Sequence, residues 1–148
     1  MSRAEWTEAI LEYFRNQAQK EKANVEPEYM LVDQVWRGQN QQILLAMEHE
    51  HQANVNEFLD KAISHLIDLR AKAKIGIFYP YLGDEKTLTD NISARILHRA
   101  ISIPIPNEEY LIILGFATKK QKHAAILFKA YFLNHHGERT GFRDQILM

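Results

Sequence analysis

Apolar residues recur at helical spacing in three stretches of the chain. Residues 4–22 place a charged face opposite an apolar stripe formed by Trp6, Ile10, Tyr13, Phe14 and Ala18. Residues 53–72 carry a longer apolar stripe, which runs from Val55 to Leu69. Spacings of three and four predict an amphipathic helix over each of these segments. Thr87 and Asp90 have the spacing of a capping box, which predicts a third helix from Thr87 to about residue 101.

Other stretches have the pattern of β-strands. Residues 29–37 and 42–50 are strand-like runs, and the polar residues 38–41 between them predict a hairpin loop. Residues 74–81 predict a short strand. Residues 110–118 are apolar at nearly every position, as is typical of a strand buried on both faces.

The C-terminal third is less clearly patterned. Residues 119–122 predict a polar turn, and the apolar segment 124–133 fits either a strand or a helix. The residues from Asn134 onward are polar, and we expect them to be loosely ordered. The order of elements predicts one α/β domain over residues 1–148, with a mixed sheet flanked by helices.

Composition narrows the class of protein. The chain has 148 residues, 46% of them hydrophobic, no cysteine and a formal net charge of -1. The absence of cysteine excludes a disulfide scaffold, a thiolate metal site and a cysteine nucleophile. The near-zero charge argues against a generic basic coat for nucleic acid, but it leaves room for a local basic site. The start of the chain lacks a signal-like apolar run, and residues 110–117 are too few to span a membrane. We therefore expect a soluble cytoplasmic protein with no membrane association.

Three acidic residues gather on one face of the predicted hairpin. Glu48 and Glu50 are two positions apart on a strand, so both point to the face opposite Met47. With residues 38–41 as a four-residue loop, paired residue numbers sum to 79. Asp33 then faces Ala46, and Glu48 is its diagonal neighbour at roughly 7–8 Å between backbones. A slip of one residue would turn Asp33 to the wrong face.

Clustered carboxylates repel one another unless a proton or a cation compensates their charge. We therefore expect a raised pKa for at least one of the three carboxylates when no metal is bound. Oxygen ligands suit a hard ion such as Mg²⁺ or Mn²⁺, which can activate water and stabilise charge on a phosphoryl oxygen. The simpler interpretation is that Glu48 and Glu50 end a strand in water and that Asp33 pairs with a lysine.

This arrangement resembles the PD-(D/E)XK nuclease superfamily, in a Glu-x-Glu variant. The resemblance lies in an aspartate on one hairpin strand, Glu-x-Glu at the end of the next, and then a helix and a further strand. It covers residues 4–22 through 74–81, and it implies a restriction-endonuclease-like fold. It also implies that Asp33, Glu48 and the backbone carbonyl of His49 hold the divalent ion, with Glu50 positioning water or a second ion.

The chain departs from that family at three places. Glu50 stands where a lysine is usual, although some type II restriction enzymes carry glutamate there. Two strands are predicted between the first two helices where the family has three, and no proline precedes Asp33. A glutamate of the first helix sometimes completes such a site, and Glu8 and Glu12 are the candidates for this role.

Several other residues have alternative interpretations. His49 and His51 form a His-x-His pair that suits zinc or iron, but Ala53 stands where HExxH has its second histidine. Arg70, Lys72 and Lys74 close the second helix, where positive charge suits the helix dipole. Tyr79 and Tyr81 are candidates for stacking on a base, although packing inside the protein is the commoner role of an aromatic ring.

Two basic clusters are candidates for contact with nucleic acid. Lys119, Lys120 and Lys122 lie in the predicted turn, where they would contact phosphates. Arg95, His98 and Arg99 share one helix face and would extend that contact.

These observations favour a divalent-metal-dependent nuclease that hydrolyses DNA phosphodiester bonds, a Mg-dependent endonuclease. Such a short domain would need a homodimer, or a fused or associated specificity partner, to select a site. The alternative is a catalytically inactive interaction or dimerisation module with the same fold, using the apolar segments 110–117 and 124–133 as its surface.

Overall fold

The computed structural model describes residues 3–29, 32–51, 56, 58–102, 106–120 and 123–147. These residues form one seven-stranded sheet whose strands follow chain order: β1 (Asn24–Tyr29), β2 (Val32–Arg37), β3 (Ile43–Glu50), β4 (Ala73–Phe78), β5 (Glu109–Lys120), β6 (His123–Leu133) and β7 (Arg139–Leu147). The helices are α1 (Arg3–Lys20), the π-helical segment Phe58–Ile63 continuing into α3 (Ser64–Asp68), and α4 (Glu85–Ser102) after a short 3-10 turn at Leu82–Asp84.

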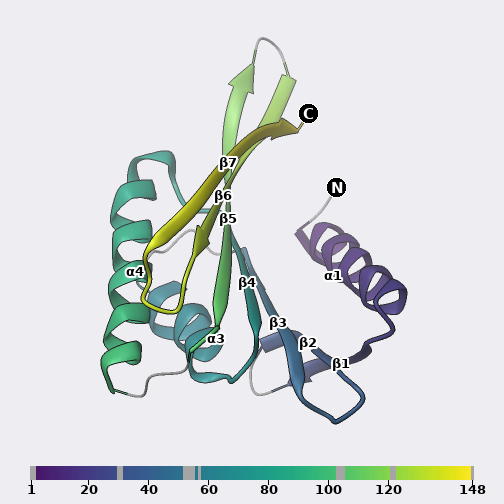
Figure 1. The fold of residues 1–148 in the computed structure, drawn as a ribbon. Coiled ribbons are helices and arrows are strands. Elements are labelled where there is room, and N and C mark those ends of the chain that lie inside the picture. The colour runs from purple at the N-terminus through teal and green to yellow at the C-terminus, as the bar shows by residue number, and fades with distance from the viewer. Residues whose placement is uncertain are drawn as a thin grey trace.

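The sheet is mixed, and its three central strands are parallel. β1, β2 and β3 form an antiparallel meander, β3, β4 and β5 run parallel, and β6 and β7 return antiparallel (Figure 1). The parallel strands are aligned so that Glu50 pairs with Phe78, which pairs with Leu114. The carboxyl ends of β3 and β4 therefore lie at one edge of the sheet, and β5 continues beyond them. The predicted single α/β domain with a mixed sheet flanked by helices is confirmed.

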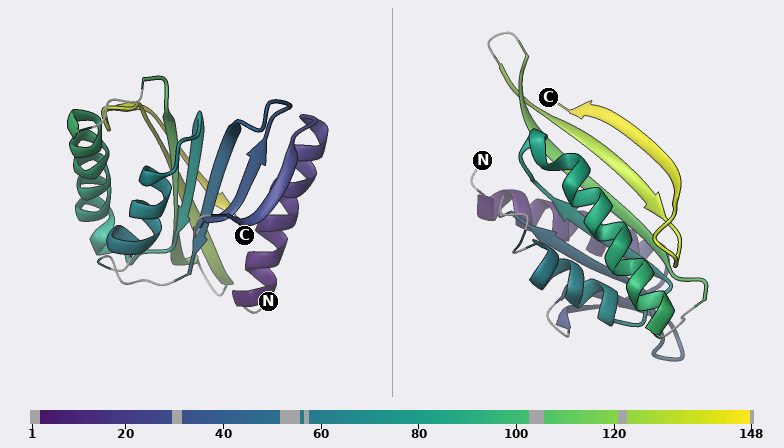
Figure 2. Two further views of the ribbon diagram at one scale, coloured as in Figure 1. Left: turned by 90° about the horizontal axis from the view of Figure 1, so that it is seen from below. Right: turned by 90° about the vertical axis from the view of Figure 1, so that its left-hand side faces the viewer.

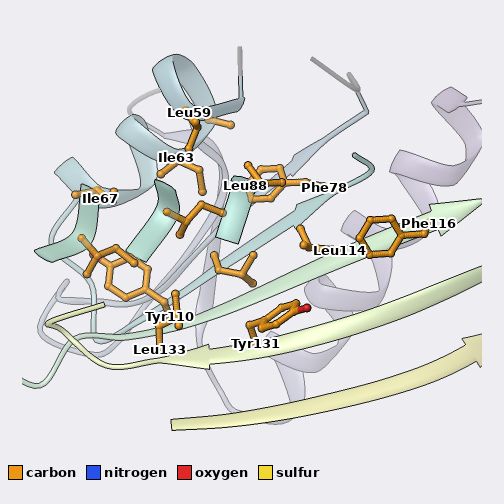
Figure 3. Close-up of a cluster of buried hydrophobic side chains, with 14 residues drawn as sticks. Leu59, Ile63, Ile67, Phe78, Leu88, Tyr110, Leu114, Phe116, Tyr131 and Leu133 are labelled. Atoms are coloured by element: carbon orange, nitrogen blue, oxygen red, sulfur yellow. The ribbon is translucent and has the colours of Figure 1, made fainter. Parts of the chain in front are cut away.

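Helices cover both faces of the sheet. α1 lies on one face, and α3 and α4 lie on the other (Figure 2). On the α1 face, Ile10, Leu11 and Phe14 pack against Met47 and neighbouring side chains. The largest apolar cluster lies between α3, α4 and strands β4 to β6 (Figure 3). A smaller cluster joins α3 to β2 and β3. Each strand of the centre is thus buried on both sides, which accounts for its nearly continuous apolar sequence.

The two edge strands were not predicted from the sequence. β1 contains Pro27 between two glutamates, and a proline is tolerated in a sheet only at an edge or a bulge. β7 is largely polar in sequence, yet it pairs with β6 from Leu133 to Ile126. The prediction of a loose tail after Asn134 was therefore wrong. An edge strand exposes more of its length to water, so its sequence need not alternate between apolar and polar residues.

Several element boundaries also differ from those predicted. The second helix ends at Asp68, because Leu69 is already extended, whereas the strand predicted from Lys74 is present as β4 from Ala73. α4 begins at Glu85, so Thr87 lies inside the helix and caps nothing. Residues 119 and 120 continue β5 and are not a turn, and the ambiguous segment 124–133 is a strand.

The β2–β3 hairpin pairs in a different register from the one predicted. Gly38 and Gln42 close a loop of three residues, in which Gln41 has a positive φ of 61°. A turn followed by a left-handed residue shifts the pairing by one position, and a bulge between Trp36 and Arg37 shifts it by another. The paired numbers therefore sum to 81 beyond the bulge, as in Gln34 with Met47. The two shifts of one residue leave Asp33 and Glu48 on one face, as predicted, whereas Val32 and Ile43 pack on the α3 face and not with Met47.

Candidate functional site

Asp33 and Glu48 are joined by two reciprocal hydrogen bonds. The register that pairs Gln34 with Met47 sets Asp33 directly beside Glu48 on the sheet face that carries α3. The backbone N–H of Asp33 donates to Oε2 of Glu48 at 3.1 Å, and the backbone N–H of His49 donates to Oδ2 of Asp33 at 2.6 Å. Both carboxyl groups are therefore held by the backbone of the neighbouring strand. The predicted convergence of these two residues is confirmed, and they are closer than the predicted diagonal.

Burial makes this pair electrostatically unusual. Glu48 is 8% exposed, and its neighbour on β4 is Gly76, over which the ring of Phe78 folds. This apolar surrounding, together with the charge of Asp33, raises the pKa of Glu48 from 4.5 to about 8. Burial also raises the pKa of Asp33, although the hydrogen bond from His49 opposes the shift. The expected raised pKa is confirmed, with desolvation as its largest cause rather than mutual repulsion.

Glu50 lies close enough to act on both of these groups. Its charge contributes to the raised pKa of both Asp33 and Glu48. The three carboxylates nonetheless do not converge on one point. Within the residues that the structure describes, no three histidine, aspartate or glutamate side chains are arranged to hold a metal ion. The donor chemistry suits a hard cation, but binding one would require these side chains to move toward a common centre.

His49 reaches the carboxylate pair only through its backbone. Its imidazole lies on the α1 face, where Nε2 is 2.9 Å from the hydroxyl of Tyr79, and burial lowers the pKa of His49 to about 4. His51 shares that face, with its Nε2 hydrogen-bonded to the hydroxyl of Thr7. The two histidines therefore face away from Asp33 and Glu48, so the structure does not bring them together with those carboxylates.

An aromatic cluster, consisting of Trp6, Tyr79 and Phe128, holds α1 against the sheet. Nε1 of Trp6 donates to the hydroxyl of Tyr79 at 2.5 Å, and the Trp6 ring stacks on Phe128. Gly115 makes room for this arrangement, because a Cβ there would lie 2.7 Å from the Tyr79 ring. Tyr79 is thus a packing residue and not a platform for a base, whereas Tyr81 is 69% exposed.

Glu8 and Glu12 of the first helix lie away from the Asp33–Glu48 pair. Glu8 and Glu12 are exposed and form ion pairs with Arg15 on α1. α1 covers the sheet face opposite to Asp33 and Glu48, so the prediction that Glu8 or Glu12 completes the site was wrong. The spacing of acids along a helix does not reveal which side of the sheet that helix covers.

The basic residues on α4 are largely occupied. Arg95 binds Asp60 at 2.8 Å and the Leu59 carbonyl at 2.9 Å, and Arg99 binds Asp68 at 2.6 Å. They join α4 to the helix before it, while His98 is exposed. Their charges are paired within the fold, so the structure gives no support to a phosphate contact here.

The lysines predicted to contact nucleic acid lie at the far end of β5. Lys119 pairs with Ala124 and Lys120 pairs with His123 in the backbone register, and Lys122 lies outside the described residues.

Sequence reasoning missed a buried ion pair. Lys74 is 0% exposed, and its Nζ binds Oε1 of Glu108 at 2.8 Å, the Ile67 carbonyl at 2.9 Å and the Tyr110 hydroxyl at 3.2 Å. Burial lowers the pKa of Lys74. The sequence signal was a lysine at the start of an otherwise apolar strand. The sequence pattern predicts Lys74 both at the start of the strand 74–81 and among the basic residues that close the helix, and it predicts no buried partner for it.

Comparisons with known proteins assign no family to this chain. No family model matches the sequence, and no curated protein matches it. Among solved structures, the crystal structure of the central domain of yeast acetyl-CoA carboxylase is similar over 86% of this chain, with 8% identity and a TM-score of 0.47. The present chain spans 25% of that chain, and a likeness at this level carries no functional argument. Within the described residues, no helix has the length and apolar character needed to cross a membrane.

Proposed function

We propose that this domain is a divalent-metal-dependent nuclease that acts on DNA phosphodiester bonds, with Asp33 and Glu48 as its metal-binding pair. The observation that carries the proposal is the pair itself: the buried carboxyl group of Glu48 and the partly buried one of Asp33 lie on adjacent strands, each held by a backbone N–H of the other strand. A buried acid that keeps its proton near neutral pH is poised to exchange that proton for a cation.

The element order supports this proposal. The third strand that the resemblance to the PD-(D/E)XK nucleases requires is present as β1, so α1 is followed by three antiparallel strands, a helix and the parallel β4. Asp33 lies on the second of these strands and Glu48 on the third, as in that superfamily. This element order supports the resemblance on which the proposal rests.

Each residue has a defined role in the proposal. Asp33 and Glu48 would hold Mg²⁺ or Mn²⁺, together with the backbone carbonyl of His49. The bound ion would lower the pKa of water and neutralise charge on the phosphoryl group. Glu50, two residues along the same strand, would accept a proton from the attacking water or bind a second ion. The His49 N–H would keep the Asp33 carboxylate oriented toward the ion.

We expect isothermal titration calorimetry to detect Mn²⁺ or Mg²⁺ binding that strengthens with pH. Because the ion must displace the proton of Glu48, the affinity should rise by up to about tenfold per pH unit between pH 6 and pH 8. Asp33→Asn should abolish binding, whereas Glu8→Gln, which removes a carboxylate from α1, should leave it unchanged. The proposed site would be contradicted if no heat of metal binding were detected at pH 8, or if Asp33→Asn left metal binding unaffected.

Cleavage is tested separately, by incubating plasmid and linear duplex DNA with the protein and Mn²⁺ at pH 8. We expect nicking or linearisation that is lost in both Asp33→Asn and Glu48→Gln. A lone domain of this size would select a site only as a homodimer or with a specificity partner. Gel filtration of the protein mixed with DNA should therefore accompany this assay, to measure the oligomeric state.

A catalytically inactive interaction or dimerisation module is the second candidate. Two observations favour it: glutamate stands at the position of the motif lysine, and no described trio of ligands is preformed. Its proposed surface needs correction, because β5 lies inside the sheet with Ile112, Leu114 and Phe116 buried. Metal binding without any cleavage would favour this candidate over the nuclease.

A further inference from the structure

We propose that the outer ends of β5 and β6 form an arm that binds the phosphate backbone of duplex nucleic acid beside the Asp33–Glu48 pair. The role of the arm in holding DNA beside the Asp33–Glu48 pair rests on the proposed nuclease function. The binding of a polyanion by the arm does not.

The arm is a two-stranded extension of the sheet. Pairing between β4 and β5 ends at Phe78 with Leu114, and β5 continues for six residues from Gly115 to Lys120 (Figure 1). At about 3.3 Å per residue, this extension reaches roughly 20 Å beyond the end of β4. On the other side, the pairing of β7 with β6 reaches only to Ile126. Among the described residues, 118–120 and 123–125 pair with each other and with no further strand.

Charge is distributed very unevenly between this hairpin and the rest of the domain. Residues 110–137 contain four lysines and no aspartate, glutamate or arginine, so they carry +4 while the whole chain carries -1. The remaining residues therefore carry -5. Lys129 is bound by Glu85 at 2.8 Å, whereas Lys119 and Lys120 occupy the last two register positions of β5. Two of the four lysines thus lie at the outer end of the described strands of the hairpin.

The base of the arm is anchored on both faces of the sheet. On the α4 face, Phe116 is buried, and the Nζ of Lys129 lies 5.6 Å from the centre of its ring. On the α1 face, Phe128 packs against Trp6 and Tyr79. A fixed base gives the outer end a defined direction relative to the sheet.

The position of the arm favours a nucleic acid as its partner. Glu48 and Glu50 lie at the same edge from which the arm extends, because β3, β4 and β5 are parallel and in line. Ionised carboxylates at that edge would repel a polyanion, so positive charge nearby would help to hold a phosphodiester there. A two-stranded β-ribbon is also narrow enough to enter a major groove, which is about 12 Å wide.

The test measures duplex binding by fluorescence anisotropy in EDTA, so that metal binding and cleavage play no part. We expect Lys119→Ala/Lys120→Ala to weaken binding roughly 10- to 100-fold at 0.1 M salt and to reduce the slope of log K against log salt by about 2. The control Arg70→Ala/Lys72→Ala removes the same charge from two exposed residues before β4, at the opposite end of the parallel strands. It should change affinity by less than about threefold. Circular dichroism and melting temperature should match the parent protein for both variants.

Three outcomes would overturn the arm: no duplex binding by the parent protein, equal losses in both double variants, or binding of phosphatidylglycerol vesicles without binding of DNA. Failure of the nuclease proposal looks different. In that case Mn²⁺ gives no heat and DNA stays intact, while the lysine-dependent, EDTA-resistant binding of duplex persists.

Discussion

Glu48→Gln is expected to stabilise the metal-free protein by about 3 kcal/mol at pH 7. The folded pKa of Glu48 is raised to about 8 by burial, from 4.5. The native state therefore keeps a proton that the unfolded state releases. The ionised form of Glu48 opposes folding. The free energy of unfolding is therefore not reduced by Glu48 below about pH 4.5, and it falls as the pH rises to 8. Glutamine avoids this loss because it is neutral, and its Oε1 can still accept the N–H of Asp33.

Urea unfolding at pH 5, 7 and 8.5 measures this effect. The parent protein should lose stability with rising pH, and Glu48→Gln should show a flatter profile and a melting temperature higher by roughly 6–12 °C at pH 7. Glu138→Gln, which removes an exposed glutamate, should stay within about 0.5 kcal/mol of the parent. A destabilised Glu48→Gln at pH 7 would mean that the folded protein holds Glu48 ionised and compensated.

The stability advantage of the same substitution should shrink when Mn²⁺ is present. The ion stabilises only the native state, so it should raise the melting temperature of the parent protein and not that of the variant. The two proteins would then approach each other in stability at saturating metal. Glu48 would thus be a residue whose burial weakens the metal-free fold in return for proton-linked cation binding.

The faces of the site residues could be predicted from sequence more securely than their pairing. A strand repeats every two residues, so Asp33 and Glu48 were assigned to one face from the apolar alternation alone. Their exact register depended on the left-handed conformation of Gln41 and on a bulge after Trp36. Glutamine at a left-handed position is not a recognisable turn signal. The two one-residue shifts kept Asp33 and Glu48 on their shared face and brought their carboxyl groups closer.

Position within the sheet explains most of the elements that were missed. β1 and β7 are edge strands, where neither face needs a continuous apolar sequence, and β1 even accommodates Pro27. The central strands β3, β4 and β5 are buried on both faces and were recognised. The side of the sheet covered by α1 could not be predicted, because an amphipathic stripe shows that a helix packs but not against which face.

A second large effect is expected at Lys74, whose partners were not predicted. Lys74→Met should destabilise the protein by about 3–5 kcal/mol. It would leave the Glu108 carboxylate buried without its countercharge, and it would also remove the donor to the Ile67 carbonyl. Oε2 of Glu108 already lacks a hydrogen-bond partner among the described residues, so the carboxylate has no alternative donor there. Lys86→Met, at an exposed ion pair with Asp90, should cost less than about 1 kcal/mol.

The double variant Lys74→Met/Glu108→Leu distinguishes the strength of the ion pair from the cost of isolating one charge. Two apolar side chains of similar volume leave no buried charge, so the double variant should recover most of the stability lost in Lys74→Met. The Tyr110 hydroxyl, which lies 3.2 Å from Nζ of Lys74, would lose that contact, and we expect a residual loss of about 1 kcal/mol. Urea unfolding of the parent, both single variants and the double variant completes the cycle. Additive losses would mean that Lys74 and Glu108 stabilise the fold independently, through their separate contacts with Ile67 and the surrounding strands.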